Sequence, residues 1–227
     1  MISEAGGICS AATLVTYGAA RVVHQRFPRR WLAPVLVTPA LLGIGLWLAG
    51  MPALDYYRLT SWLLWFLGPA TVAFALPIYQ QREWLRRYPI SITAGVVSGV
   101  ALGVASSWLV GHLFRLSPEL SRSMLLRSIS TPFALAAAQA TGASMNLTAL
   151  VVLLTGFLGM ILGEFVLLWV RPQSPLAQGA LWGAASHAFG TARAHQLDYQ
   201  AGAISSLIMI LAGILLVLLA PWLAVLR

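Results

Sequence analysis

Long apolar stretches without a single charged side chain are the dominant pattern of this chain. They lie at residues 31–54, 59–81, 88–113, 128–163, 172–192 and 199–226. A helix needs about 20 predominantly apolar residues to cross a bilayer, and each stretch reaches that length. The alternation of apolar and polar residues that marks membrane strands is absent. The pattern therefore predicts an all-α, polytopic transmembrane helical bundle.

The apolar pattern divides the chain into spans within one integral membrane domain over residues 1–227. Two further segments, 128–142 and 176–197, are interrupted by small and polar residues, and the sequence leaves open whether they cross the membrane or re-enter it. We therefore expect six to eight spans. The six full-length ones are 6–23, 33–50, 61–79, 89–112, 146–170 and 201–226.

Local signals interrupt or shape several of these helices. Gly68-Pro69 and Pro77 predict that 61–79 is not a regular helix, because proline removes a backbone donor and blocks the carbonyl four residues back. Ser117-Pro118-Glu119 predicts the start of an amphipathic helix over 116–127. Small residues spaced by four predict close packing along one face of 89–112: Ser91, Gly95, Gly99, Gly103 and Ser107.

The same order, a short interrupted segment followed by a long apolar helix, occurs three times. The interrupted segments are 67–79, 129–142 and 183–197, and the helices that follow are 90–112, 147–170 and 201–225. Transporter folds often contain such internal repeats, with broken helices that meet near the middle of the membrane. The pattern therefore suggests an internal repeat.

Composition and charge exclude several classes of protein. Hydrophobic residues make up 59% of the 227 and charged residues only 9%, whereas about a quarter of the residues of a soluble domain are charged. The net charge of +8 comes from arginines at the ends of apolar segments, where they suit membrane lipids and not nucleic acid. The single Cys9 rules out an internal disulfide and offers no metal cluster, and we expect no cofactor.

The stretch Trp182–Asp198 differs from its apolar surroundings. It carries Ser186, His187, Thr191 and Arg193 among small residues that include Gly190. An ionisable group at the bilayer centre costs roughly 2.5–3.5 kcal/mol on insertion scales, so such groups usually face a cavity or a partner. We interpret the stretch as a binding site at membrane depth; the alternative is a loop whose polar residues lie in water.

Other interrupted segments are expected to complete that site. Thr131-Pro132 and Gly68-Pro69 resemble the starts of half-helices, whose N-terminal amides favour an anion, and Thr131 is expected to cap its helix. Arg193 would bind a carboxylate through two hydrogen bonds, and His187 would exchange a proton. The remaining candidates are polar side chains that suit the hydroxyl or carbonyl groups of a small acid: Ser186, Thr191, Thr71, Gln139 and Asn146.

An enzyme is not expected. The chain contains no G-x-S-x-G or H-E-x-x-H motif, and its six acidic residues are scattered. No metal site is expected, since His187 and His195 lie eight residues apart without a third ligand nearby. Glu164 is expected at the headgroups, or buried with a partner for which Arg171 is a candidate.

Four motifs in order along nearly the whole chain resemble the LrgB/CidB family of membrane proteins. They are LLWFLGPATVAFALPIYQQR (63–82), LLRSISTPFALAAAQATGA (125–143), LLTGFLGMILG (153–163) and GAASHAFGTARAHQL (183–197). Members of that family typically have SHGxGTARA at the last motif, where this chain has Ala188 and Phe189. They often have lysine at the position of Arg127, and usually proline at that of Glu164, so no role is inherited for Glu164.

The resemblance implies two kinds of function. Bacterial members are labelled antiholin-like or murein-hydrolase regulators, which act with a small partner membrane protein of the LrgA/CidA type. Plant relatives are similar to plastid glycolate/glycerate translocators, and bacterial members are linked to pyruvate and similar acids. We expect a transporter of small monocarboxylates, proton-coupled through His187, in a homo- or hetero-oligomer in the bacterial cytoplasmic membrane. The alternative is a holin-like or antiholin-like regulator of murein hydrolase activity and autolysis.

Arginine-rich loops predict the orientation of the chain. Residues 21–30 and 80–89 are rich in arginine, whereas the connection at 51–58 has only Arg58. Because basic loops stay in the cytoplasm, the N-terminus is expected outside. In a Cys9→Ala background, single cysteines at Gln25 and Trp84 should react only with reagents that reach the cytoplasm. Labelling of either position from the periplasm would contradict this orientation.

Overall fold

Helices make up the regular structure of the described chain. The computed structural model describes residues 4–27, 29 and 32–223, which contain no strand, and this confirms the all-α class. The chain forms two compact units, Met1–Leu67 and Gly68–Arg227, and each is described by itself. The single domain expected over residues 1–227 remains a prediction.

Side-chain hydrogen bonds link the helices of the first unit. The hydroxyls of Thr13 and Tyr56 lie 2.5 Å apart, and Trp62 Nε1 donates to Ser10 Oγ at 2.9 Å. The connection expected at 51–58 is mostly helical, because Pro52 precedes the first turn and Asp55 suits its N-terminal dipole. The helices of this unit are α1 (Glu4–Arg26), α2 (Pro34–Leu48), α3 (Ala53–Thr60) and the 3-10 helix η2 (Ser61–Phe66).

The interruption predicted within 61–79 is confirmed. Helix α4 (Leu67–Ala73) ends before Phe74, and α5 (Ala75–Gln80) follows it. Pro77 explains the position of the break, because its ring blocks the carbonyl of residue 73. A further short helix, α6 (Arg82–Arg87), carries the predicted basic loop.

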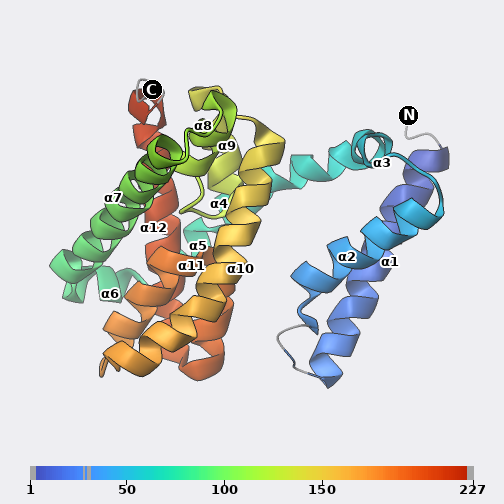
Figure 1. Ribbon diagram of the computed structural model, residues 1–227. Coiled ribbons are helices and arrows are strands. Elements are labelled where there is room, and N and C mark those ends of the chain that lie inside the picture. Colours follow the sequence, from blue (N-terminus) through green and yellow to red (C-terminus); the bar gives the residue numbers. More distant parts are fainter. Residues whose placement is uncertain (1–3, 28, 30–31, 224–227) are drawn as a thin grey trace. The chain divides into compact units, whose positions relative to one another are not determined.

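Three long helices form the frame of the second unit (Figure 1). They are α7 (Pro89–Leu113), α10 (Met145–Val170) and α12 (Tyr199–Leu223), with 25, 26 and 25 residues. At 1.5 Å per residue each is about 37–39 Å long, which exceeds the ~30 Å hydrocarbon core of a bilayer. Helix α12 is buried on most sides, whereas α10 exposes Leu150, Leu154, Leu158 and Leu162 at a spacing of four. Such an exposed apolar stripe suits contact with lipid.

Fewer helices qualify as spans than the six to eight expected. By length and composition, four candidates lie in the described part of the chain: Ala53–Gln80, Pro89–Leu113, Met145–Val170 and Tyr199–Leu223. The apolar part of α2, Leu36–Leu48, is too short for this criterion, and α1 is not among the four. The two interrupted segments do not add spans, because both fold back on themselves.

The first of these segments, which we call hairpin 1 (residues 124–141), enters the unit and returns to the same end. It begins at the end of α8 (Pro118–Leu125), whose predicted start is confirmed by a hydrogen bond from the Leu120 amide to Ser117 Oγ. Helix α9 (Thr131–Thr141) forms its second arm. The ends of the hairpin meet where Ser123 Oγ donates to the carbonyl of Ser144 at 3.4 Å. Figure 1 shows α8 and α9 at the end of the unit where α12 ends.

The second, hairpin 2 (residues 175–197), is helix α11 (Pro175–Leu197) with a sharp reversal. His187 has non-helical dihedral angles, φ 43° and ψ −125°. Both arms meet Ser205 of α12: a Cβ on Gly183 would lie 2.5 Å from the Ser205 carbonyl oxygen, and the Thr191 hydroxyl lies 2.9 Å from the Ser205 hydroxyl. In a continuous helix residues 183 and 191 would be about 12 Å apart along the axis. The chain therefore turns back at His187.

The two hairpins enter the unit from opposite ends. Helix α10 begins directly after hairpin 1 and ends directly before hairpin 2, so it runs from one entrance to the other. Each hairpin is followed by one long helix, α10 or α12. This is an inverted arrangement of two similar pieces, as found in several transporter folds.

Cysteine accessibility tests this arrangement. Exposed positions flank both hairpins, Glu119 and Asn146 around hairpin 1, and Gln173 and Asp198 around hairpin 2. On the Cys9→Ala background, cysteines at the first two positions should label from one side of the membrane, and those at the last two from the other. Labelling of Gln173→Cys and Asp198→Cys from opposite sides would show that α11 crosses the membrane.

Candidate functional site

The reversal of hairpin 2 buries two of the predicted site residues. Ser186 is fully buried and His187 is 2% exposed. Among the residues that the structure describes, Ser186 Oγ and His187 Nε2 have no hydrogen-bond partner. Glycines of α10 make room for them: a Cβ on Gly159 would lie 2.7 Å from Ser186 Oγ, and one on Gly156 would lie 3.2 Å from His187 Nδ1. A buried polar group without a partner costs free energy, so the tip of hairpin 2 is a place where a ligand would be favourable.

Two other predicted residues hold the arms of hairpin 2 together. Besides its hydrogen bond to Ser205, Thr191 places its hydroxyl 3.8 Å from the sulfur of Met209. A Cβ on Gly190 would lie 2.5 Å from the carbonyl oxygen of Trp182 in the other arm. In this structure both residues therefore support the hairpin, and the Thr191 hydroxyl is already hydrogen-bonded.

The tip of hairpin 1 carries the start of α9. Thr131 is not the capping residue, because it already belongs to the helix, and Ser130 occupies the N-cap position. Pro132 follows in the first turn, where its missing amide costs nothing. Ser130 is 4% exposed, and its hydroxyl has no hydrogen-bond partner within the described chain. The N-terminal end of α9 thus combines a positive helix dipole with an unpaired hydroxyl.

The two tips meet along α7, where the small residues spaced by four lie. A Cβ on Gly99 would lie 2.7 Å from Ala184 in hairpin 2, and one on Gly103 would overlap Ser128 in hairpin 1. Gly99 and Gly103 are four residues apart, about 6 Å along the axis, and lie near the middle of α7. The close packing predicted for this face is therefore confirmed at these positions, and it brings both hairpin tips to mid-depth of the unit.

An arginine that the sequence analysis did not assign to the site lies at this junction. Arg127 Nε donates to Ser107 Oγ at 2.8 Å, and its Nη2 donates to Ser106 Oγ at 2.9 Å. The backbone and the charged guanidinium of Arg127 both lie near the His187 imidazole. The available signal was an arginine directly before a long apolar stretch, 128–163.

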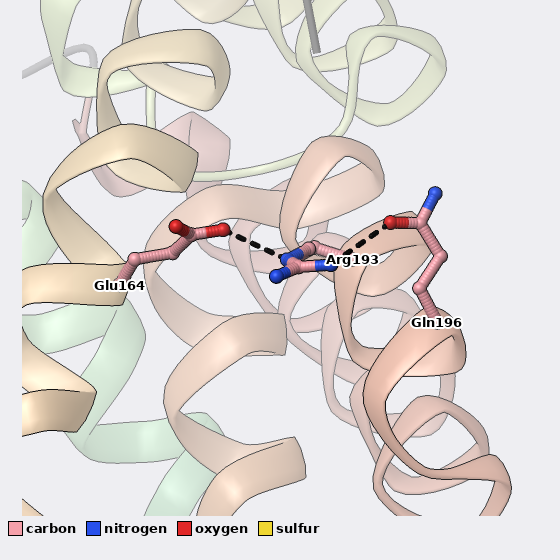
Figure 2. Close-up of polar contacts among 3 residues, drawn as sticks. All are labelled: Glu164, Arg193 and Gln196. Carbon is pink, nitrogen blue, oxygen red and sulfur yellow. Dashed lines mark hydrogen bonds and ion pairs between the residues drawn. The ribbon is translucent and has the colours of Figure 1, made fainter. Parts of the chain in front are cut away.

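Arg193, the predicted carboxylate-binding residue, is already paired with a carboxylate of the protein. Its Nε donates to Glu164 Oε1 at 2.8 Å and its Nη1 donates to Gln196 Oε1 at 3.1 Å, as Figure 2 shows. The side chains of Arg193 and Glu164 are 24% and 19% exposed. Glu164 is thus mostly buried, as in the less favoured alternative to a headgroup position, and it pairs with Arg193. Arg171, the candidate partner, instead donates its Nε to the Leu168 carbonyl at the end of α10. A substrate role for Arg193 remains a prediction. It would require the substrate carboxylate to replace Glu164 as the ion-pair partner of Arg193.

Several predicted site residues lie away from the two tips. Gln139 and Asn146 are exposed, at the end of α9 and the start of α10. Gly68 and Pro69 are also exposed, and a Cβ on Gly68 would meet nothing within 4 Å. Thr71, in α4, is partly buried. The structure therefore leaves Gln139, Asn146, Gly68 and Pro69 exposed, outside the buried hairpin junction.

Comparison with known proteins identifies the family. The family model described as "LrgB-like family" matches residues 13–226. The chain belongs to the LrgB-like family. It is 38% identical to YwbG of Bacillus subtilis (strain 168) over 212 residues, which cover 93% of this chain and 94% of the relative. It is 33% identical to the "Holin-like protein CidB" of Staphylococcus aureus (strain N315) over 209 residues, 92% of this chain and 91% of the relative. No solved structure matches the chain.

Phe189, at the variable position of the LrgB/CidB motif, lies next to the tip of hairpin 2. The ring of Phe189 packs on Gly156, where a Cβ would lie 2.7 Å from its Cδ2, and it meets Phe157 edge-on at 6.5 Å between ring centroids. Phe189 therefore fills space beside His187 with an apolar ring.

In the described chain of this LrgB-like protein, no group of three or more His, Cys, Asp or Glu residues could hold a metal ion.

Close backbone contact at Gly183 yields a prediction about stability. Replacement by alanine forces the new methyl group against the Ser205 carbonyl, so Gly183→Ala should destabilise the protein by about 1–3 kcal/mol. A suitable control is Gly95→Ala, because its methyl group would meet Ile208 and Ala180 at the ordinary distances of 3.5 and 3.6 Å. Thermal unfolding in detergent measures both variants. Equal melting temperatures for the two would contradict the docking of hairpin 2 on α12.

Proposed function

We propose that this chain is a holin-like or antiholin-like protein that regulates the permeability of the bacterial cytoplasmic membrane. The supporting observation is its similarity, over 92% of its length, to proteins named "Holin-like protein CidB". Long apolar helices of the second unit agree with a role inside a membrane. Control of murein hydrolases and of autolysis would then follow from a change in permeability. A small membrane protein of the LrgA/CidA type is the proposed partner, and an N-terminus outside the membrane is the proposed orientation.

A specific observation favours a second function, transport of small monocarboxylates such as pyruvate, glycolate or glycerate. Two hairpins from opposite ends meet at mid-depth, and their tips carry three buried polar atoms without a hydrogen-bond partner among the described residues: Ser130 Oγ, Ser186 Oγ and His187 Nε2. A pore formed only by association of subunits needs no such interior site, whereas carriers commonly bind their substrate between broken helices. The proposed carrier would couple transport to a proton through the His187 imidazole, which lies buried at the tip of hairpin 2.

Flux measurements in proteoliposomes distinguish the two functions. The chain is reconstituted alone and together with an LrgA/CidA-like partner, and entry of labelled pyruvate and of sucrose is followed. A carrier predicts saturable uptake of pyruvate, competition by glycolate and glycerate, and no entry of sucrose. A holin-like pore predicts a leak of both solutes that rises in proportion to concentration. Absence of any flux, with the partner present, would contradict both the carrier and the holin-like pore.

A further inference from the structure

Arg127 is a half-buried cation of the helical unit, and no carboxylate of the described residues lies beside it. Within residues 4–27, 29 and 32–223, no Asp or Glu lies at ion-pair distance from its guanidinium, and its recorded partners are the Ser106 and Ser107 hydroxyls. Arginine keeps its positive charge at any physiological pH. A charge taken out of water is unfavourable unless an opposite charge compensates for it. Arg193, by contrast, has Glu164 as its counter-ion.

The two serines fix the guanidinium and leave part of it available. An arginine side chain carries five N–H donors, and the hydrogen bonds to Ser106 and Ser107 use one on Nε and one on Nη2. Both serines also donate to the carbonyl of Gly103 in their own helix, which orients their lone pairs toward Arg127. The guanidinium is therefore held at a set position on α7 with donors to spare.

A groove of about 410 Å³ opens beside this guanidinium. Four hydroxyl-bearing residues, Ser98, Ser106, Ser128 and Thr155, line it together with Arg127. The rest of its wall is largely glycine and alanine of α7 and α11, including Gly99 and Ala184. One cation, several hydroxyls and short apolar side chains suit a small anion that carries a hydroxyl or carbonyl group. The groove touches both hairpins, since Ser128 belongs to hairpin 1 and Ala184 to hairpin 2.

We propose that Arg127 binds the carboxylate of the transported monocarboxylate in this groove, through a bidentate pair of hydrogen bonds from its guanidinium. This inference rests on the proposed transport function and assigns its anion-binding residue. The bound carboxylate supplies the counter-ion that the protein itself does not place beside Arg127. Ser106 and Ser107 are positioning residues, because they orient the guanidinium and do not replace it. The alternative is that Arg127 serves only to fasten hairpin 1 to α7.

Substitutions at Arg127 test the charge and the shape of the contact. In proteoliposomes, Arg127→Lys keeps the charge but loses the two-pronged geometry, so the concentration of pyruvate for half-maximal uptake should rise at least tenfold. Arg127→Gln should abolish saturable uptake. Arg115→Gln removes the same charge from an exposed position just beyond α7 and should leave uptake near that of the wild type. Arg193→Lys tests the other candidate for the carboxylate: if the carboxylate binds at Arg127, this variant keeps the half-saturation of the wild type, because Arg193 is paired with Glu164.

A second set of variants separates binding from fastening. The double variant Ser106→Ala/Ser107→Ala removes the two hydrogen bonds that hold Arg127 on α7 but keeps the cation. It should therefore retain saturable uptake, with a half-saturating pyruvate concentration only several-fold higher. Thermal unfolding in detergent gives a readout apart from transport: pyruvate should raise the melting temperature of the wild type, and its neutral amide should not. In Arg127→Gln the difference between acid and amide should disappear.

Each remaining outcome has a defined meaning. If the double serine variant loses uptake as completely as Arg127→Gln, and pyruvate still stabilises Arg127→Gln more than the amide does, Arg127 only fastens the hairpin. If Arg193→Lys and not Arg127→Lys raises the half-saturation, the carboxylate binds at Arg193. Both results overturn the assignment and leave transport intact. If the wild type shows neither saturable uptake nor stabilisation by pyruvate, the transport function itself fails.

Discussion

The reversal of the chain at His187 is the constraint on which the second unit depends. One residue with φ 43° and ψ −125° turns what would be a 23-residue helix into two arms. A backbone conformation of this kind costs of order 1–3 kcal/mol in a residue other than glycine, and it persists only where the surroundings determine it. Here the surroundings do so on two sides, because α12 holds both arms at Ser205 and α10 offers glycines opposite the tip.

Glycines explain how two hairpins fit among three long helices. Without a side chain at Gly99, Gly103, Gly156, Gly159 and Gly183, neighbouring segments approach at distances that a methyl group would prevent. Helices in lipid gain little from the hydrophobic effect, so such close contact and polar contacts between helices supply much of the association. The same close packing carries the polar tips of both hairpins to mid-depth, where a guanidinium and several hydroxyls face one groove.

Much of the framework could be predicted from the sequence. Runs of about 20 apolar residues located α7, α10 and α12, and Ser117-Pro118-Glu119 located the start of α8. Proline and glycine marked the interrupted segments. The course of these segments could not be predicted, because hydropathy does not distinguish a helix that crosses the membrane from two arms that pack on α12. The break at His187 depends on contacts with Ser205 and Gly159, which are distant in sequence.

Predictions for the site were less complete for the same reason. His187 and Ser186 lie in the interior as expected of a site at membrane depth, whereas Gln139, Asn146 and Gly68 are exposed. Polarity alone does not show which way a side chain on a short helix points. The pairing of Arg193 with Glu164, 29 residues earlier, and the position of Arg127 beside Ser106 and Ser107 are tertiary contacts without a local signal.

The distance across hairpin 2 tests the account most directly. Spin labels at Gln173→Cys and Asp198→Cys, on a Cys9→Ala background, flank the two arms, and their separation can be measured by pulsed electron paramagnetic resonance. Packed helices lie about 8–10 Å apart, so the account predicts a short distance, close to the length of the label arms. A continuous helix over these 25 steps would place the labels about 37 Å apart. A distance near that value would contradict the hairpin, and with it the meeting of the two tips.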